Sequence, residues 1–148
     1  METIYNGNRL LTIVSIDEIN YETFISKDKE YIVMINVAND FEMNLIEKNI
    51  PDILNKNCKE IFCINKFCEQ MHDKFDDYIF DYEYKNIMTT WEKSDSFDEQ
   101  CFYFFNAVGA YNDVNFYIIL CDNKIKKYTR KFKRYFIKHF EIAKKGIL

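Results

Sequence analysis

Four short runs of apolar residues constrain the fold of this chain more than any other feature. They are Tyr31–Val37, Glu60–Ile64, Asn86–Trp91 and Phe116–Cys121. The apolar residues follow one another instead of alternating with polar ones, which is typical of strands buried on both faces. Strands that alternate with helical segments favour right-handed crossovers and parallel pairing. We therefore predict an α/β fold, a three-layer sandwich with a mostly parallel central sheet of about four to five strands and helices on both faces.

The segments between these runs carry helix signals. Ser15 and Ser96 each stand three residues before a glutamate, which is the pattern of a capping box, and Asn39 stands three residues before Glu42. Gly109 is placed to end the helix that Ser96 begins. The predicted helices cover about 16–25, 40–55 with a break at Pro51, 67–80, 97–108 and 124–145. In addition, Asn6-Gly7 predicts a turn between Thr3–Tyr5 and Arg9–Val14, and so an N-terminal hairpin.

Length and composition bound the class of protein. The chain has 148 residues with five cysteines, three glycines and one proline. This length suits one domain, and no linker or repeat divides it, so we expect a single α/β domain over residues 1–148. No apolar run approaches the roughly 20 residues of a membrane span. An odd number of cysteines, without the features of a signal peptide, argues against a disulfide framework. We therefore expect a cytoplasmic protein that does not bind a membrane.

Motifs of common catalytic and cofactor sites are absent from the sequence. There is no glycine-rich phosphate loop, no nucleophile elbow and no H-E-x-x-H zinc motif. Cys58, Cys63 and Cys68 lack the tight C-x-x-C spacing of zinc sites. Cys68 and His72 stand one helical turn apart and could form a nucleophile and its base, but a surface cysteine and a helical histidine are commoner. We predict no catalytic residue, no metal and no cofactor, and favour a binding function over an enzymatic one.

Charge is distributed very unevenly along the chain. Residues 1–123 carry 10 basic and 23 acidic side chains, whereas residues 124–148 carry 10 basic and one acidic. The basic side chains fit the solvent-exposed face of a helix, and the acidic remainder would repel nucleic acid, so we do not expect a nucleic-acid partner. The acidic side chains are densest around the predicted helix 67–80. We predict a partner-binding surface made of Asp73, Asp76, Asp77, Asp81 and Glu83, with Trp91 and Glu92 near its edge.

This surface predicts a function. Dense negative charge steers a basic partner and speeds its association, and many bacterial toxins are basic nucleases. We therefore predict a bacterial immunity or antitoxin-like protein that neutralises a basic toxin, which could be a nuclease. The alternative is a small enzyme or ligand-binding domain, because polar residues follow the predicted strands and ligands of open α/β sheets bind at the carboxyl ends of strands. These residues are Asn36, Asn39, Asp40, Asn65, Thr90–Glu92, Asp122 and Asn123.

One segment resembles a known family. Residues 86–105 read Asn-Ile-Met-Thr-Thr-Trp-Glu-Lys-Ser-Asp-Ser-Phe-Asp-Glu-Gln-Cys-Phe-Tyr-Phe-Phe. This resembles a family of small, uncharacterised bacterial α/β domains with a strand ending in Met-Thr-Thr-Trp, an acidic loop and an aromatic-rich helix. Residues 58–65 and the Cys68 to Asp73 spacing resemble the second strand of that family and its next helix. The resemblance covers roughly residues 31–122. It implies an α/β fold and a bacterial origin, and it carries over no catalytic residue.

Overall fold

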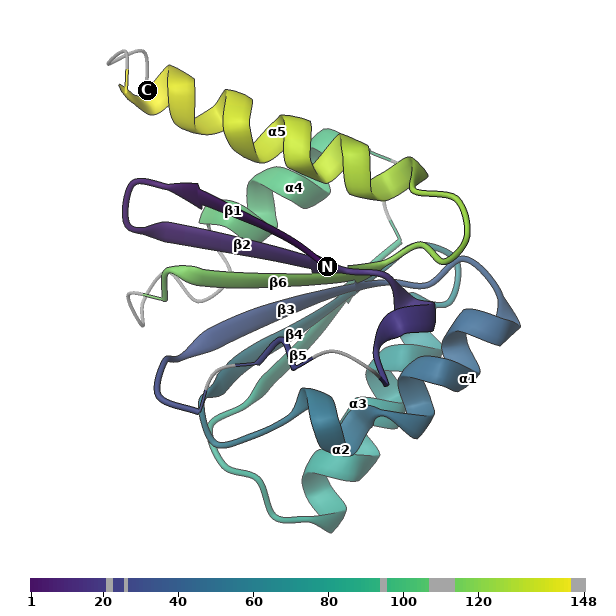
Figure 1. Ribbon diagram of the computed structural model, residues 1–148. Coiled ribbons are helices and arrows are strands. Elements are labelled where there is room, and N and C mark those ends of the chain that lie inside the picture. The colour runs from purple at the N-terminus through teal and green to yellow at the C-terminus, as the bar shows by residue number, and fades with distance from the viewer. Residues whose placement is uncertain (21–22, 26, 94–95, 107–113, 145–148) are drawn as a thin grey trace.

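The computed structural model describes residues 1–20, 23–25, 27–93, 96–106 and 114–144. Within these residues, six strands form one sheet in the order β1-β2-β6-β3-β4-β5 (Figure 1). The strands are β1 (Glu2–Asn6), β2 (Arg9–Val14), β3 (Tyr31–Asn36), β4 (Cys58–Ile64), β5 (Met88–Glu92) and β6 (Phe116–Cys121). The four predicted strands all lie in this one sheet. The prediction of four to five strands was too low, because both strands of the N-terminal hairpin join it.

Five of the six strands run parallel. β2 pairs with β6, β6 with β3, β3 with β4 and β4 with β5, all in parallel, and β1 pairs with β2 antiparallel. The predicted hairpin is confirmed: Asn6 is opposite Arg9, and Gly7 in the connecting turn has a φ of 64°. That value lies in the left-handed region, which glycine enters without the steric penalty of a Cβ atom. The fold is thus an α/β sheet with one antiparallel edge.

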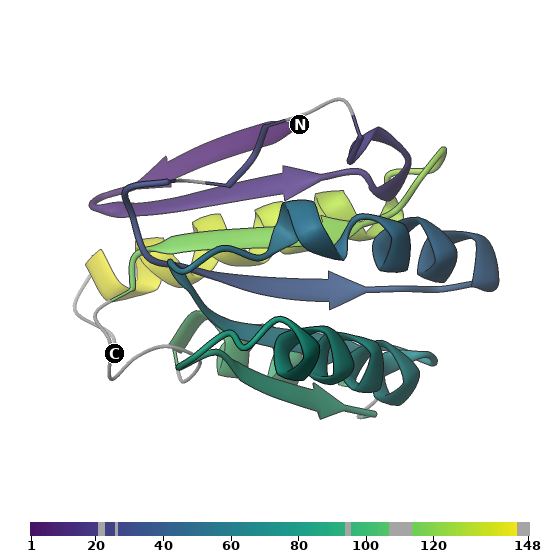
Figure 2. The same ribbon diagram turned by 90° about the horizontal axis from the view of Figure 1, so that it is seen from below.

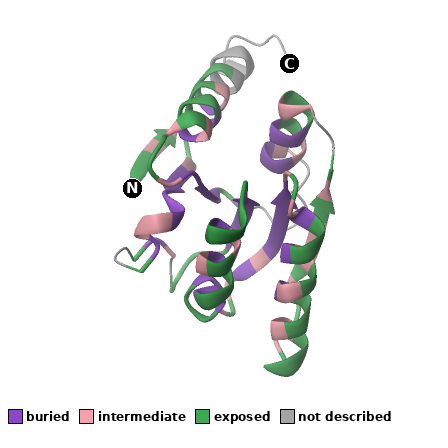
Figure 3. Ribbon diagram, turned by 90° about the vertical axis from the view of Figure 1, so that its right-hand side faces the viewer, coloured by how far each residue is buried: buried purple, intermediate pink, exposed green. Residues whose placement is uncertain are grey.

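Helices cover both faces of the sheet. The helices α1 (Asp40–Lys48), α2 (Ile50–Ile53) and α3 (Cys68–Asp81) lie on one face, and α4 (Phe97–Asn106) and α5 (Lys127–Lys144) lie on the other. Figure 2 shows the first group from its own side, in front of the strands. Buried residues concentrate on the strands and on the inner sides of the helices, as Figure 3 shows. The expected three-layer arrangement is therefore confirmed. The prediction of burial on both faces was wrong for β5, because this strand lies at the edge of the sheet and none of its residues is buried.

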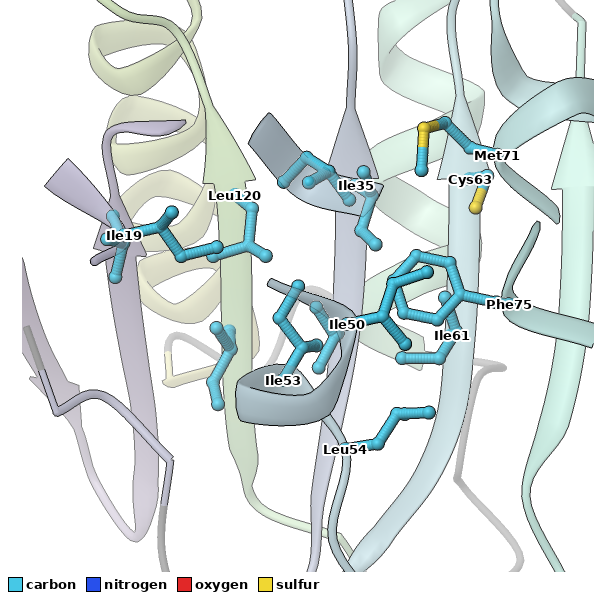
Figure 4. Close-up of a cluster of buried hydrophobic side chains, with 14 of the residues drawn as sticks. Ile19, Ile35, Ile50, Ile53, Leu54, Ile61, Cys63, Met71, Phe75 and Leu120 are labelled. Atoms are coloured by element: carbon cyan, nitrogen blue, oxygen red, sulfur yellow. The ribbon is translucent and has the colours of Figure 1, made fainter. Parts of the chain in front are cut away.

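Alternation along β3 divides its side chains between two cores. Tyr31, Val33 and Ile35 belong to the core beneath α1, α2 and α3, in which Ile35, Ile61 and Phe75 lie close together (Figure 4). Ile32 and Met34 belong to the core beneath α4 and α5, which also holds Phe104, Phe105 and Phe132. Every residue of β3 and β6 is buried, which is what strands covered on both faces require.

Two of the predicted helix starts are confirmed. The Asn39 side chain accepts a hydrogen bond of 2.9 Å from the Glu42 backbone N–H, and the Ser96 hydroxyl accepts one of 3.2 Å from Glu99. The break at Pro51 is also confirmed, since α1 ends at Lys48 and α2 begins at Ile50. Gly109, the predicted end of α4, lies outside the described residues.

Other helix predictions were wrong in their extent. In place of a helix over 16–25, the structure has a single 3₁₀ turn over Ile16–Glu18, and the Ser15 hydroxyl bonds to Lys126 instead of capping a helix. The last helix begins at Lys127, not at residue 124. Three large apolar side chains in or beside these helices are exposed: Phe41, Phe102 and Ile125. Among the described residues, no helix has the length and apolar composition needed to cross a membrane.

The burial of Phe105 gives a test of the α4 core. This side chain is buried and contacts the rings of Phe104, Tyr117 and Phe136. Replacing it with alanine should lower the free energy of unfolding by about 3–5 kcal/mol, because the packing is lost and a cavity remains. Phe102→Ala is the matched control on the same helix: this side chain is 57% exposed, and its loss should change the free energy by less than about 1 kcal/mol. Urea denaturation measures both, and equal losses would show that the packing of α4 is misassigned.

Candidate functional site

Helix α3 presents one apolar and one acidic side. Cys68, Met71 and Phe75 are buried against the sheet. With 3.6 residues per turn, the opposite side of the helix carries Asp73 and Asp77, flanked by Asp76 and Asp81. All four of these aspartates are exposed. We call this set, Asp73, Asp76, Asp77 and Asp81, the acidic face. The structure therefore brings four of the seven predicted partner-binding residues onto one helix surface.

One of these aspartates, Asp76, also holds α3 against β5. The Thr89 hydroxyl of β5 donates a hydrogen bond to Asp76. The His72 ring lies between two carboxylates, with Nδ1 3.1 Å from Asp73 and Nε2 3.4 Å from Asp76. The outer aspartates differ: in the described part of the chain, no basic side chain lies within 4.0 Å of Asp77 or Asp81. Their charge is therefore available to an approaching partner.

An exposed aromatic side chain stands among these carboxylates, and the sequence reasoning missed it. Phe80 is three residues after Asp77 and four after Asp76, so it lies next to both on the helix surface. Its side chain is 83% exposed. Just beyond the helix end, Tyr82 is also exposed and stacks on Tyr78 with ring centroids 4.3 Å apart. Helical periodicity alone could have predicted the exposure of Phe80, since this residue lies on the opposite side of the helix from Met71 and Phe75.

The remaining predicted residues lie around this surface in different ways. Glu83 is exposed in the turn after α3, with a φ of 55°. Trp91 is opposite Cys63 in the sheet register, which places it on the same sheet face as α3, and it is 41% exposed. Glu92 is opposite Ile64, and so strand alternation places it on the face of α4 and α5. The structure thus separates Glu92 from the acidic face.

Near Trp91, a lysine modifies the edge of this surface. The Lys93 ammonium lies 5.7 Å from the centroid of the Trp91 ring and 3.2 Å from the Glu69 carboxylate. Trp91 of β5 therefore lies near the amino-terminal end of α3, whereas Asp81 and Glu83 lie at the carboxyl-terminal end. Since a helix rises 1.5 Å per residue, the predicted surface spans about 20 Å.

The cysteine and histidine on α3 lie in different surroundings. Cys68 is buried at the start of the helix, and burial raises the pKa of its thiol. An activated cysteine requires the opposite shift, toward the thiolate. His72 instead contacts Asp73, Asp76 and Thr89. Across the residues that the structure describes, no group of three metal-ligating side chains comes together.

The carboxyl ends of the strands meet at one edge of the sheet, as parallel pairing requires. The Asn65 side-chain amide donates a 2.8 Å hydrogen bond to the side-chain oxygen Oδ1 of Asn36, which joins the ends of β4 and β3. The Asn123 amide donates one of 2.8 Å to Glu42, which joins the end of β6 to α1. The other Glu42 oxygen accepts the Ala38 backbone N–H. The predicted convergence of polar groups is therefore present, and much of it fastens strands to helices.

Asp122 has such a structural role at the end of β6. Its carboxylate accepts hydrogen bonds from the backbone N–H groups of Tyr128 and Thr129, at 3.2 and 2.7 Å, and from the Thr129 hydroxyl at 2.8 Å. These are donors of the first turn of α5, which have no partner within the helix. Asp122 therefore caps α5 across a short loop, which explains why the helix starts at Lys127.

Glu60 is a carboxyl group buried within β4. Burial raises the pKa of this carboxyl, and hydrogen bonds from Thr90 and Tyr103 oppose the shift in part. Glu60 lies on the sheet face that α4 and α5 cover, away from the carboxyl ends of the strands. It is therefore a core group whose pKa depends on folding, and it is not a member of the candidate site.

The raised pKa of Glu60 predicts how stability depends on pH. The folded protein keeps this proton to a higher pH than the unfolded chain, whose glutamates titrate near 4.5. The free energy of unfolding should therefore fall as pH rises through this window. Glu60→Gln removes the effect, so its stability relative to wild type should rise as the pH increases above about 4.5. Denaturation across this range measures the difference, and Glu83→Gln is the exposed control. A constant difference for Glu60→Gln would contradict the assignment.

Comparison with known proteins adds a family. A family model described as a domain of unknown function (DUF7684) matches residues 13–137 of the chain. No curated protein matches the chain. The matched residues run from β2 into α5 and include both the acidic face and the strand carboxyl ends.

Proposed function

The chain belongs to the DUF7684 family of domains, and we propose that it is a protein-binding module whose acidic face binds a basic protein. We propose further that it acts as an immunity or antitoxin-like protein, which neutralises a basic toxin by covering its active surface. The observation that carries this proposal is the exposed Phe80 among the four carboxylates of the acidic face.

The charge of this surface supports a basic partner. Like charges that are held close together repel one another and destabilise the folded chain. The presence of these carboxylates on one surface therefore favours a function for their electrostatic field. Asp77 and Asp81 have no ion pair within the described residues, and neither has Glu83. Exposed carboxylates of this kind attract a positively charged protein over several ångströms and speed its association.

The aromatic side chains supply what charge alone does not. Rim charges mainly set the association rate, whereas buried aromatic anchors contribute most of the affinity of a protein interface. Phe80 and Tyr82 are large, exposed and next to the acidic face. Together with Trp91 near the other end of the helix, this surface extends about 20 Å along α3. It is therefore too long for a small ligand, and its length suits an interface of about 800 Å² per partner.

Charge reversal tests the proposal. The variant Asp77→Lys/Asp81→Lys should bind a basic partner with a lower association rate and little change in the dissociation rate, because these carboxylates act before contact. At low salt the association rate should fall about tenfold or more, and the difference should shrink as salt is added. Surface plasmon resonance measures both rates, with candidate basic toxins from the native host as the partners.

The control variant changes the same amount of charge elsewhere. Glu2 and Asp98 are exposed carboxylates on β1 and at the start of α4. Glu2→Lys/Asp98→Lys should therefore keep the wild-type association rate. Co-expression in the native host gives the functional readout: wild type and control should protect cells from the toxin, and the Asp77/Asp81 variant should not. If no basic toxin is neutralised, or if both variants behave alike, the proposal is wrong.

Removal of the Phe80 ring tests the aromatic anchor separately. Phe80→Ala should raise the dissociation rate by about 30-fold or more, as expected for loss of a central aromatic contact worth about 2 kcal/mol. It should leave the free energy of unfolding within about 0.5 kcal/mol of wild type, because the ring is solvent-exposed. Phe41→Ala on α1 is the matched control, since Phe41 is also an exposed phenylalanine on a helix. Unchanged binding by Phe80→Ala would remove this residue from the interface.

A further inference from the structure

A cavity lies on the opposite side of the sheet from the acidic face. It has a volume of about 540 Å³ and lies where β3 and β4 end and α4 and α5 begin. The residues that matter here are Asn36, Lys66, Lys93, Phe97, Tyr128 and Lys131. Small-molecule sites in proteins have about 300–1,000 Å³, and open α/β sheets place them at the carboxyl ends of the strands. The volume and the position of this cavity both match that pattern.

The strongest sign of a ligand is an unpartnered amide in the cavity wall. Asn36 is the last residue of β3 and is 1% exposed. Its side-chain oxygen Oδ1 accepts the hydrogen bond from Asn65, whereas its Nδ2 group is buried and has no hydrogen-bond partner among the described residues. A buried polar group without a partner costs about 1–3 kcal/mol. Because Asn36 lines the cavity, an acceptor atom of a bound molecule would satisfy this donor.

Three lysines give the cavity its charge. Lys66 follows β4, Lys93 follows β5 and Lys131 lies in the second turn of α5. The Lys93 ammonium has one carboxylate partner, Glu69. Lys66 and Lys131 have none within 4.0 Å among the residues that the structure describes, and they lie over the rings of Phe67 and of Phe97 and Tyr128. A ligand with more than one negative charge would therefore find unneutralised cations here.

The helix ends beside the cavity add little to this attraction. The first N–H groups of α5 already bond to the Asp122 carboxylate, and the Ser96 hydroxyl caps α4. Affinity for an anion must therefore come from the lysines and from the Asn36 amide. Lysine binds phosphate as a point charge, and the rings of Phe97 and Tyr128 offer apolar surface beside the cations.

We propose that this cavity binds a phosphate-bearing small molecule. The lysines neutralise its phosphate oxygens, the Asn36 Nδ2 group donates a hydrogen bond to one of its acceptors, and Phe97 and Tyr128 contact its less polar part. The site is distinct from the acidic face, since α3 lies across the sheet from α4 and α5 (Figure 1). Lys93 lies at the sheet edge between the two, because its ammonium also contacts Glu69 of α3. The proposal consequently does not depend on the protein partner.

Calorimetric titration with three probes tests the site. Adenosine monophosphate, ribose 5-phosphate and inorganic phosphate share the phosphate group and differ in what accompanies it. A nucleoside phosphate that binds more tightly than the other two would point to the rings as a base platform, and equal binding of the two organic phosphates would point to a sugar phosphate. In either case Lys66→Ala and Lys131→Ala should each weaken binding about tenfold, as expected for loss of one charged hydrogen bond.

The controls separate a built site from diffuse surface charge. Lys138→Ala removes one lysine from the same helix, outside the cavity, and should leave the affinity within twofold of wild type. In a nitrogen–proton NMR spectrum, the Asn36 side-chain amide signals should shift on binding, whereas those of the exposed Asn44 should not. Asp77→Lys/Asp81→Lys should bind the probe like wild type. Equal losses for Lys131→Ala and Lys138→Ala, or no binding of any probe at millimolar concentration, would overturn the proposal.

Discussion

The complete burial of β3 and β6 is the constraint on which the rest of this structure depends. Every side chain of both strands is buried, so each face of the sheet needs its own helical layer. α1 to α3 supply one layer and α4 and α5 the other. The two layers begin at the same edge, because helices that follow parallel strands all start near the strand carboxyl ends. This edge is therefore where polar groups gather, although the central strands β3 and β6 themselves carry few.

The same constraint separates the two candidate surfaces. α3 packs its apolar side on one face of the sheet and turns its aspartates outward, away from the strand ends. The cavity with Asn36 lies between the sheet edge and the other layer. One surface is long, acidic and convex, because it is the exterior of a helix, and the other is a small cavity lined by three lysines. Their chemistry suits different classes of partner, and a single domain of this size can carry both without either disturbing the other.

Much of the fold could be predicted because its signals are local. Continuous apolar runs report burial on both faces, and the caps at Asn39 and Ser96 involve residues only three apart in sequence. The failures come from distant contacts. Ser15 carries the same local pattern as Ser96, but its hydroxyl bonds to Lys126, which no spacing could indicate. Lys66, Lys93 and Lys131 likewise come from three separate segments, and only the folded sheet brings them to one cavity.

The place of β6 between β2 and β3 has a consequence for how the chain folds during synthesis. Residues 10–14 of β2 pair with residues 116–120 of β6, and residues 32–36 of β3 pair with the other side of the same strand. The unit β3-β4-β5 can assemble as it leaves the ribosome, since its pairings are between consecutive strands. The N-terminal hairpin is synthesised first, but it cannot join the sheet until β6 has been made, because β2 pairs with β6 and not with β3. Until then two apolar strand edges, on β2 and β3, can pair with other chains. The risk that the nascent protein aggregates through these edges therefore lasts until β6 has been translated.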